Sequence, residues 1–305
     1  MAQARVLGAA QRQPALPVVR DALDLAARLP RLVLEARRVS AALHGLHGRR
    51  RAGPGETFWQ YRPLVAGESS SGIDWRRSAR DGHFFVRERE WEASHAIWLW
   101  IDRSASMGFQ SQLAQASKVD RALVCGLAMA EALVEAGERV GHIGLMRPTA
   151  SRQIVERLAQ AISADAAGTT ADMPPALPLP RLAEAVIVTD GLTPAADFAA
   201  RIATLAADGA RGHLLLIADP IEETFPFSGQ AELADLEDGV TLRVGDADSW
   251  GEAYRARLAE HREAIAKACH AAGWTLTLHR TDRPASEALL RLTMLIAAVR
   301  GTAGR

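Results

Sequence analysis

The sequence predicts an α/β domain with a Rossmann-like parallel sheet and helices on both faces, preceded by an N-terminal helical and β-hairpin appendage. From residue 96 onward, short apolar runs alternate with longer segments of helical periodicity, which is the order of βαβ units. Several of these runs are apolar along their whole length, as strands covered on both faces are. Residues before 96 lack this alternation, so we expect three regions, which are residues 1–52, 53–95 and 96–305.

The strands and helices predicted for the third region follow one another in order. We expect strands at 96–101, 140–146, 185–189, 212–218 and 274–279, and helices at 119–136, 195–207, 250–272 and 286–299, with a proline-punctuated helix after residue 170. Three of the strands run directly into an aspartate, at Asp102, Asp190 and Asp219. Ligands of parallel sheets bind at the carboxyl ends of strands, so these acids are the first candidates for a functional site.

The N-terminal region is predicted to be helical and basic. Helical periodicity covers residues 18–29, and Pro30 should end or kink that helix. An apolar stripe then predicts a second helix that packs on the main domain, and its members are Leu32, Ala36, Val39, Leu43 and Leu46. Residues 1–51 hold ten arginines against three acids. A solvated face is the simplest explanation of this charge, and a docking surface for a partner is the alternative.

Residues 53–95 combine aromatic side chains, arginines and glycines. Five of the seven tryptophans of the chain lie between Trp59 and Trp100. Short runs separated by glycine predict β-hairpins. Interleaved arginine and aromatic residues could also stack on single-stranded nucleic acid. Acids balance the arginines between Asp74 and Glu92, however, which favours pairing within the protein.

Composition excludes several classes of protein. The 36 basic and 36 acidic residues balance, so the basic excess typical of nucleic-acid-binding domains is absent. Two distant cysteines, Cys125 and Cys269, exclude a disulfide framework and favour a cytoplasmic protein. No apolar run reaches the roughly 20 residues of a membrane span, so we expect no transmembrane segment. Neither Lys118 nor Lys267 follows a glycine, which excludes a P-loop ATPase.

An acidic segment at 219–248 holds nine acids against Arg243. It is long for a loop, so we expect short strands within it. Its charge could face the basic N-terminal helices. Asp219, Glu222 and Glu223 could form a second cation site, although an acidic loop is the simpler interpretation.

The motif that carries chemistry follows the first predicted strand of the sheet. Asp102, Ser104 and Ser106 form a D-x-S-x-S loop, in which alternate side chains of an extended turn point the same way. Carboxylate and hydroxyl oxygens suit a hard divalent cation such as Mg²⁺ or Mn²⁺. Three side chains cannot complete its shell of roughly six oxygens, so further ligands must come from other loops. A serine cap on the following helix is the simpler structural explanation of the motif.

Two later segments extend this motif into a known pattern. A Gly-Thr-Thr loop at 168–170 and a Thr-Asp-Gly turn at 189–191 follow in the chain. With the D-x-S-x-S loop they resemble the metal-ion-dependent adhesion site (MIDAS) of von Willebrand factor A domains. The ligands that this resemblance implies, directly or through water, are Asp102, Ser104, Ser106, Thr169 and Asp190. Thr170 is the alternative register for Thr169.

A second resemblance covers roughly residues 20–300. The residues that carry it are Gly53-Pro54-Gly55 with Phe58-Trp59, Gly67-Glu68, the run from Ile73 to Arg80, and Arg87-Glu88 ahead of the D-x-S-x-S strand. With these features the chain resembles the bacterial domain of unknown function 58 (DUF58) family. Many members are encoded beside MoxR-type AAA+ ATPases, and the pair is thought to act in chaperone-like assembly or cofactor insertion. Some members carry N-terminal membrane spans.

Together the resemblances imply a non-enzymatic adaptor. Its metal would receive an Asp or Glu of a protein partner, either a MoxR-type ATPase or a client. A Mg²⁺-dependent hydrolase is the first alternative, with Asp102 or Asp190 orienting a water on the metal. A suitably placed general base is not visible in the sequence. A single-stranded nucleic-acid-binding module is the second alternative.

Overall fold

The computed structural model describes residues 4–5, 31, 33–40, 58–63, 75–81, 83–89, 96–165, 171–181, 183–234, 236 and 240–303 of the 305-residue chain. The chain forms two compact units, one of residues 1–48 and 95–305 and the other of residues 49–94. The predicted division into residues 1–52, 53–95 and 96–305 stays a prediction.

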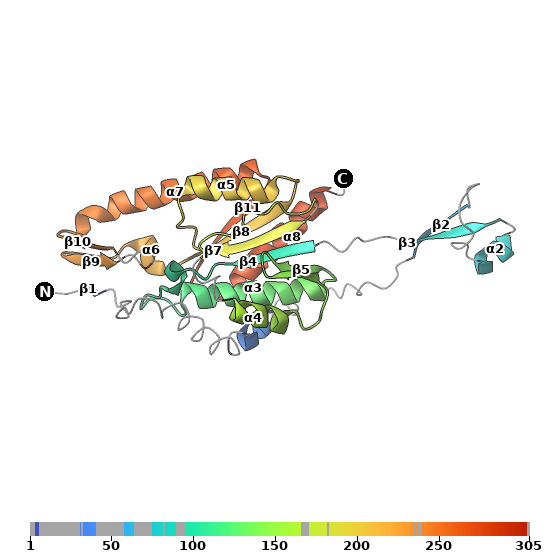
Figure 1. The fold of residues 1–305 in the computed structure, drawn as a ribbon, viewed down its shortest axis with the longest axis horizontal. Coiled ribbons are helices and arrows are strands. Elements are labelled where there is room, and N and C mark those ends of the chain that lie inside the picture. The colour runs from blue at the N-terminus through green and yellow to red at the C-terminus, as the bar shows by residue number, and fades with distance from the viewer. Residues whose placement is uncertain are drawn as a thin grey trace. The chain divides into compact units, whose positions relative to one another are not determined.

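A six-stranded sheet lies at the centre of the larger unit (Figure 1). The strand order is β11-β8-β7-β4-β5-β6, and every neighbouring pair is parallel except β5 and β6. The strands are β4 (Ala96–Ile101), β5 (Arg139–His142), β6 (Met146–Thr149), β7 (Glu184–Thr189), β8 (Arg211–Ala218) and β11 (Thr275–Arg280). The predicted α/β fold with a parallel sheet is confirmed, and β6 is the one antiparallel strand of this sheet in the described part of the chain.

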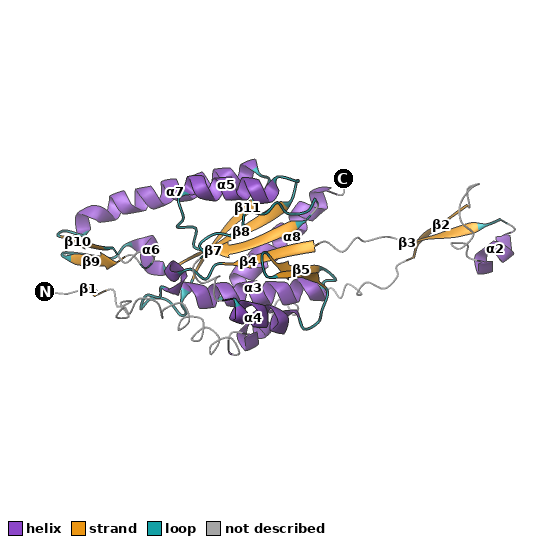
Figure 2. Ribbon diagram, viewed as in Figure 1, coloured by secondary structure: helices purple, strands orange, loops and turns teal. Residues whose placement is uncertain are grey.

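Helices cover both faces of the sheet (Figure 2). One buried apolar cluster joins the strands to α3 (Lys118–Glu135), α4 (Ile154–Ala164) and α8 (Ala285–Ala303). A second cluster on the other face joins them to α5 (Ala195–Ala206) and α7 (Gly251–Ala271). Gly126 allows α3 to approach β4 closely, because a Cβ at this position would lie 2.5 Å from Ile101 Cδ1. The close approach packs α3 against β4, the strand that leads into the D-x-S-x-S loop.

Three elements of this unit differ from the sequence prediction. The segment predicted as one strand at 140–146 is a hairpin, in which residues 143–145 lead from β5 into the antiparallel β6. Gly144 permits this turn, since its φ of +83° is a left-handed conformation open to glycine. The described residues 171–181 contain no helix, because prolines at 174, 175, 178 and 180 lack the N–H groups that a helix needs. The helix α4 is not predicted by the sequence patterns.

Residues 33–40 are helical, which confirms part of the second predicted N-terminal helix. Ala36 is fully buried in the same apolar cluster as α3, and Val33 and Val39 pack against that cluster. This part of the helix therefore packs on the main domain, as expected. Outside the described residues lie the predicted helix at 18–29 and three members of the apolar stripe, Leu32, Leu43 and Leu46.

The smaller unit contains an antiparallel pair of strands where the sequence predicts β-hairpins. The pair is β2 (Phe58–Pro63) and β3 (Phe85–Arg89), and an unpredicted helix, α2 (Trp75–Asp81), lies between them in sequence. Trp75 and Phe84 meet edge to face with ring centroids 6.0 Å apart. The Phe85 N–H donates to Ser78 Oγ over 2.9 Å. These contacts hold α2 against the start of β3.

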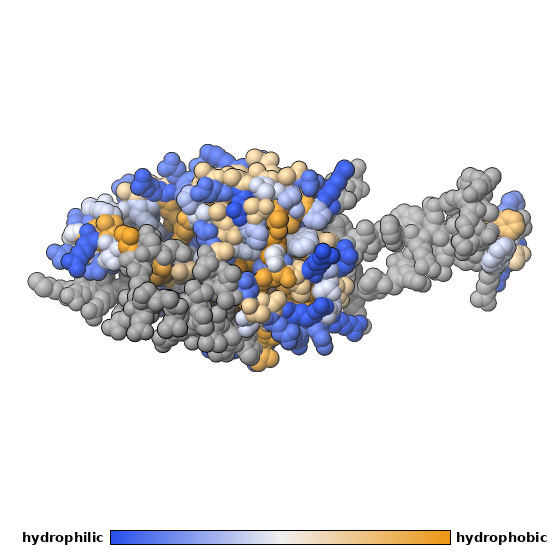
Figure 3. Space-filling model, in the orientation of Figure 1, coloured by the Kyte–Doolittle hydropathy of each residue, from blue (hydrophilic) through white to orange (hydrophobic). Residues whose placement is uncertain are grey.

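The acidic segment 219–248 forms a small satellite of the larger unit. Its elements are α6 (Pro220–Thr224), β9 (Ala231–Ala234), β10 (Thr241–Val244) and the 3-10 helix η4 (Asp248–Trp250). Phe225 lies in its apolar cluster and stacks on Tyr254 of α7, with centroids 4.7 Å apart. β9 pairs antiparallel with β10 and parallel with β1 (Ala4–Arg5), where Arg5 lies opposite Glu232. The expected short strands are thus present. Val240, Leu242 and Trp250 are exposed apolar residues of this segment, and Figure 3 shows apolar residues at this end of the larger unit.

Candidate cation-binding site

Two loops meet where β4 and β7 end side by side. β4 leads into Asp102 and then into the short 3-10 helix η2 (Ala105–Gly108), and β7 leads into Asp190. The Asp102 N–H donates to the Val188 carbonyl over 2.8 Å, so the parallel pairing continues to the first residue of the loop. Both loops therefore leave the same edge of the sheet, where ligands of parallel sheets bind.

The Asp102 carboxylate folds the D-x-S-x-S loop back on itself. Its Oδ1 accepts hydrogen bonds from the Ser104 N–H over 2.9 Å and from Ser104 Oγ over 2.6 Å. This is the local turn that aspartate favours with the backbone two residues on. Ser104 precedes η2 but makes no capping bond with its side chain, and Ser117 caps α3 instead. The serine-cap explanation therefore does not account for Ser104.

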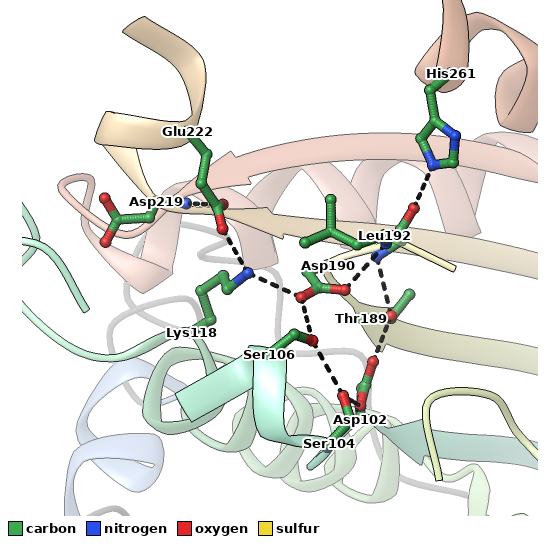
Figure 4. Close-up of polar contacts among 11 residues, drawn as sticks. Asp102, Ser104, Ser106, Lys118, Thr189, Asp190, Leu192, Asp219, Glu222 and His261 are labelled. Atoms are coloured by element: carbon green, nitrogen blue, oxygen red, sulfur yellow. Dashed lines mark hydrogen bonds and ion pairs between the residues drawn. The ribbon is translucent and has the colours of Figure 1, made fainter. Parts of the chain in front are cut away.

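Ser106 brings the two loops into contact, and Ser104 lies beside it (Figure 4). Their hydroxyl oxygens lie 3.3 Å apart, and Ser106 Oγ donates to Asp190 Oδ2 over 2.8 Å. The structure thus brings together four of the five predicted site residues, because Asp102 is hydrogen-bonded to Ser104. The fifth, Thr169, and its alternative Thr170 lie outside the described residues.

Thr189 also belongs to this group, although it is not among the predicted site residues. Thr189 Oγ1 donates to Asp102 Oδ2 over 2.7 Å and accepts from the Gly191 N–H over 3.1 Å. Thr189 is fully buried at the end of β7. Its position beside Asp190 in the Thr-Asp-Gly turn is the sequence signal that could have identified it.

The surroundings of Asp102 disfavour the negative charge of its carboxylate. Burial raises the pKa of Asp102 to about 7, and the negative charge of Asp190 adds to the rise. Hydrogen bonds from Ser104 and Thr189 act in the opposite direction but do not cancel it. The hydrogen bonds therefore stabilise the ionised carboxylate only in part, and the positive charge of a nearby cation would stabilise it further.

Lys118, the first residue of α3, places a cation inside the group. Its side chain is fully buried, and Nζ donates to Asp190 Oδ2 over 2.8 Å and to Glu222 Oε1 over 2.6 Å. Burial alone would lower the pKa of Lys118, but the charges of Asp190 and Glu222 outweigh it and hold the pKa above its usual value. Sequence reasoning misses this contact. The available signal is a rare residue type, one of two lysines, at the start of the helix after the D-x-S-x-S loop.

The acids at the end of β8 fix the start of α6. Asp219 accepts from backbone N–H groups of α6 and of Ser111, and Glu222 Oε2 accepts from the Asp219 N–H over 2.8 Å. Asp219 and Glu222 thereby form a capping box. Glu223 pairs with Arg262 of α7. The three acids considered as a second cation site are therefore bonded to backbone donors and basic side chains.

Two further contacts hold the Thr-Asp-Gly turn in place. His261 Nε2 of α7 donates to the Gly191 carbonyl over 2.7 Å, and the Leu192 N–H donates to Asp190 Oδ1 over 3.1 Å (Figure 4). The first contact ties the turn to a helix on one face of the sheet. The second leaves Asp190 Oδ2 directed toward Ser106 and Lys118.

The donor set fits a hard divalent cation. Asp102, Ser104, Ser106 and Asp190 offer two carboxylates and two hydroxyls, which are the oxygen ligands that Mg²⁺ and Mn²⁺ prefer. In the described part of the chain, no group of three or more His, Cys, Asp or Glu side chains is arranged to hold a metal ion. A cation here would therefore depend on the serine hydroxyls as much as on the carboxylates.

A hydrogen-bonded chain of hydroxyl, histidine and acid occurs elsewhere in the sheet. His213 Nδ1 lies 2.8 Å from Thr275 Oγ1, and His213 Nε2 lies 2.8 Å from Glu184 Oε1. These residues lie near the starts of β11, β8 and β7, whereas Asp102 follows the end of its strand. His213 is fully buried. The arrangement ties three neighbouring strands together.

The sequence and structure match several known proteins. Residues 60–264 match the family described as Protein of unknown function DUF58. The chain is 28% identical over 282 residues, covering 86% of this chain and 87% of the relative, to Uncharacterized protein Rv1480 of Mycobacterium tuberculosis. The same values apply to Uncharacterized protein Mb1516 of Mycobacterium bovis.

Two solved structures are also similar. BatB from Bacteroides thetaiotaomicron shows 14% identity and a TM-score of 0.39, with 68% of this chain and 100% of that chain covered. An aerotolerance-related membrane protein from Bacteroides fragilis shows 17% identity and a TM-score of 0.36, with 65% and 98% covered. None of the helices in the described ranges is long and apolar enough to cross a membrane.

Proposed function

The chain belongs to the DUF58 family, and we propose that its sheet edge is a protein-binding site in which a divalent cation, Mg²⁺ or Mn²⁺, receives an acidic side chain of a partner. The observation that supports this most directly is the 2.8 Å hydrogen bond from Ser106 Oγ to Asp190 Oδ2, which joins the D-x-S-x-S loop to the Thr-Asp-Gly turn. The residues proposed to hold the cation are Asp102, Ser104, Ser106 and Asp190, with Thr169 added from the MIDAS resemblance.

The residues have distinct roles in this proposal. Asp102 holds the serine loop through Ser104, while Thr189 holds its second oxygen. Asp190 brings a negative charge from the neighbouring strand. The cation, when bound, supplies positive charge and a coordination position that a carboxylate can take. An exposed Asp or Glu carries the complementary charge and is the feature by which the partner would be recognised.

We further propose that the partner is a MoxR-type AAA+ ATPase or one of its clients, as the family resemblance implies. The chain would then be a cytoplasmic adaptor in chaperone-like assembly. A non-enzymatic role is proposed because the MIDAS resemblance implies a site that binds a partner. Both oxygens of Asp102 and both oxygens of Asp190 accept hydrogen bonds that hold the two loops in place.

Cation binding is tested first, by titrating the full chain with Mn²⁺ and measuring free Mn²⁺ by electron paramagnetic resonance. Wild type is expected to bind one ion, and Ser106→Ala is expected to lose it. Ser249→Ala is the matched control, because Ser249 is exposed and lies outside the site. An occupancy that Ser106→Ala leaves unchanged would contradict the proposal.

Partner binding is tested with a purified MoxR-type AAA+ ATPase from the same genome. Immobilised wild type is expected to retain the ATPase in Mg²⁺ and to release it in EDTA. Asp102→Ala is expected to retain little under either condition. Equal recovery in all four conditions would rule out a cation-dependent contact.

A further inference from the structure

Lys118 and a divalent cation would draw on the same carboxylate oxygen. Asp190 Oδ2 accepts hydrogen bonds from Ser106 Oγ and from Lys118 Nζ, each over 2.8 Å. Ser106 is one of the hydroxyls proposed to hold the cation. The lysine therefore already supplies positive charge to the group of oxygens that the cation would use.

The surroundings of Lys118 give its ammonium group a second carboxylate. Nζ donates to Glu222 Oε1 over 2.6 Å, and Glu222 Oε2 is held by the Asp219 N–H over 2.8 Å. The Lys118 N–H donates to the Phe109 carbonyl over 3.1 Å, which fixes the base of the side chain. Because Glu222 is independently anchored, Lys118 can give up Asp190 without becoming an unpaired buried charge.

We propose that Lys118 is a resident cation that competes with the divalent cation for Asp190 and thereby sets the affinity of the site, an inference that rests on the proposed function. Glu222 retains the lysine when Asp190 is engaged by the divalent cation. Like charges repel strongly where burial lowers the effective dielectric constant, so removing the lysine charge is expected to tighten binding at least about tenfold. Lys118 is a positioning residue for Asp190 and is not itself a ligand.

The experiment compares Mn²⁺ affinity by isothermal titration calorimetry in full-length wild type, Lys118→Met and Lys267→Met. Lys267 is the only other lysine of the chain, and it is exposed and paired with Glu263. Its replacement removes the same charge away from the site. We expect Lys118→Met to bind Mn²⁺ at least about tenfold more tightly than wild type, and Lys267→Met to match wild type.

A second pair of variants covers the case in which Lys118→Met does not fold. That substitution leaves Asp190 and Glu222 without their shared cation, and a buried unpaired charge is strongly destabilising. The double variant Lys118→Met with Glu222→Gln removes one negative charge together with the lysine, and Glu222→Gln alone is its reference. Circular dichroism reports the folded state of each variant before titration.

The possible outcomes separate this inference from the proposed function. If wild type binds Mn²⁺ and removal of the lysine charge raises the Mn²⁺ affinity by less than the expected factor, the role of Lys118 is overturned while the proposed function stands. If only the variants without Lys118 bind, the inference is supported and the cation dependence proposed for the natural chain fails. If no variant binds, both fail.

Discussion

Thr189 Oγ1 donates a 2.7 Å hydrogen bond to Asp102 Oδ2 and thereby links the ends of two neighbouring parallel strands. Asp102 Oδ1 is held by Ser104, so the threonine serves the other oxygen of a carboxylate that is only 1% exposed. A buried acceptor that loses its donor costs more free energy than the bond itself contributes. The link therefore supports both the fold and the candidate site.

Thr189→Val is expected to lower the free energy of unfolding by about 1–3 kcal/mol, because it keeps the shape of the side chain but removes the donor. Thr189→Ser retains the hydroxyl and should lose less. Urea denaturation in the presence of EDTA measures the difference. A valine variant as stable as wild type would show that Asp102 Oδ2 does not depend on this bond.

Asp102→Asn is expected to stabilise the protein at pH 8 when divalent cations are chelated. Burial raises the pKa of Asp102 from its usual 3.8 to about 7. A carboxyl whose pKa is raised on folding destabilises the folded state as pH rises from the unfolded to the folded value. The gain is at most about 4 kcal/mol, at about 1.4 kcal/mol per pKa unit, and it is reduced because the Asn amide nitrogen cannot accept the hydrogen bond that one carboxylate oxygen accepts. The variant should also lose stabilisation by Mn²⁺.

The control for this substitution is Asp208→Asn, since Asp208 is exposed. Urea denaturation at several pH values between 4 and 8 provides the measurement. The advantage of Asp102→Asn over wild type should grow between pH 4 and about 7 and then level off. An advantage independent of pH, or a loss of stability at pH 8, would contradict the explanation.

Acid is expected to destabilise the fold through His142. Burial lowers the pKa of His142 to about 4, and the residue is 2% exposed on β5. The unfolded chain takes up the proton near pH 6.5, so the contribution is complete above that pH and is lost as pH falls toward 4. The loss amounts to about 3 kcal/mol. Buried His279, with its pKa also lowered to about 4, acts in the same direction.

His142→Gln should flatten the dependence of stability on pH between 6.5 and 4, whereas the exposed His270→Gln should not. Thermal unfolding followed by circular dichroism at each pH gives the comparison. If the two variants show the same slope as wild type, His142 is not the titrating group.

The two lysines should differ sharply toward an amine-reactive reagent. Lys118 is fully buried between two carboxylates, and the Lys267 side chain is 74% exposed. Brief acetylation of the folded chain should modify Lys267 and spare Lys118, and unfolding in guanidinium should expose both. Peptide mass spectrometry reads the two sites separately. If Lys118 in the folded chain were modified as fast as Lys267, its side chain would not be buried between the two carboxylates.

Most of the sheet and part of the site follow from local sequence patterns. β4 and β7 are apolar runs that each lead into an aspartate, and parallel strands deliver their carboxyl ends to a common edge. One topological rule is therefore enough to bring Asp102 and Asp190 together. The D-x-S-x-S spacing adds Ser104 and Ser106 because their turn is built by Asp102 itself.

The remaining features depend on contacts between distant parts of the chain. Lys118 meets Asp190 across 72 positions and Thr189 meets Asp102 across 87, and the sequence signals that mark Lys118 and Thr189 do not name these partners. The β5–β6 hairpin is missed because an apolar run does not reveal where it turns, and only the positive φ of Gly144 marks the place. These are effects of side-chain direction and backbone conformation, which periodicity does not encode.

α7 carries contacts to both the satellite and the Thr-Asp-Gly turn. Tyr254 stacks on Phe225, and His261, seven residues later, donates to the Gly191 carbonyl. Seven residues make close to two helical turns, so both contacts project from one side of the helix, about 10 Å apart along its axis. One inserted residue between them would swing one contact about 100° around the axis relative to the other. The number of residues between Tyr254 and His261 is therefore fixed by these two contacts, whereas surface loops tolerate extra residues.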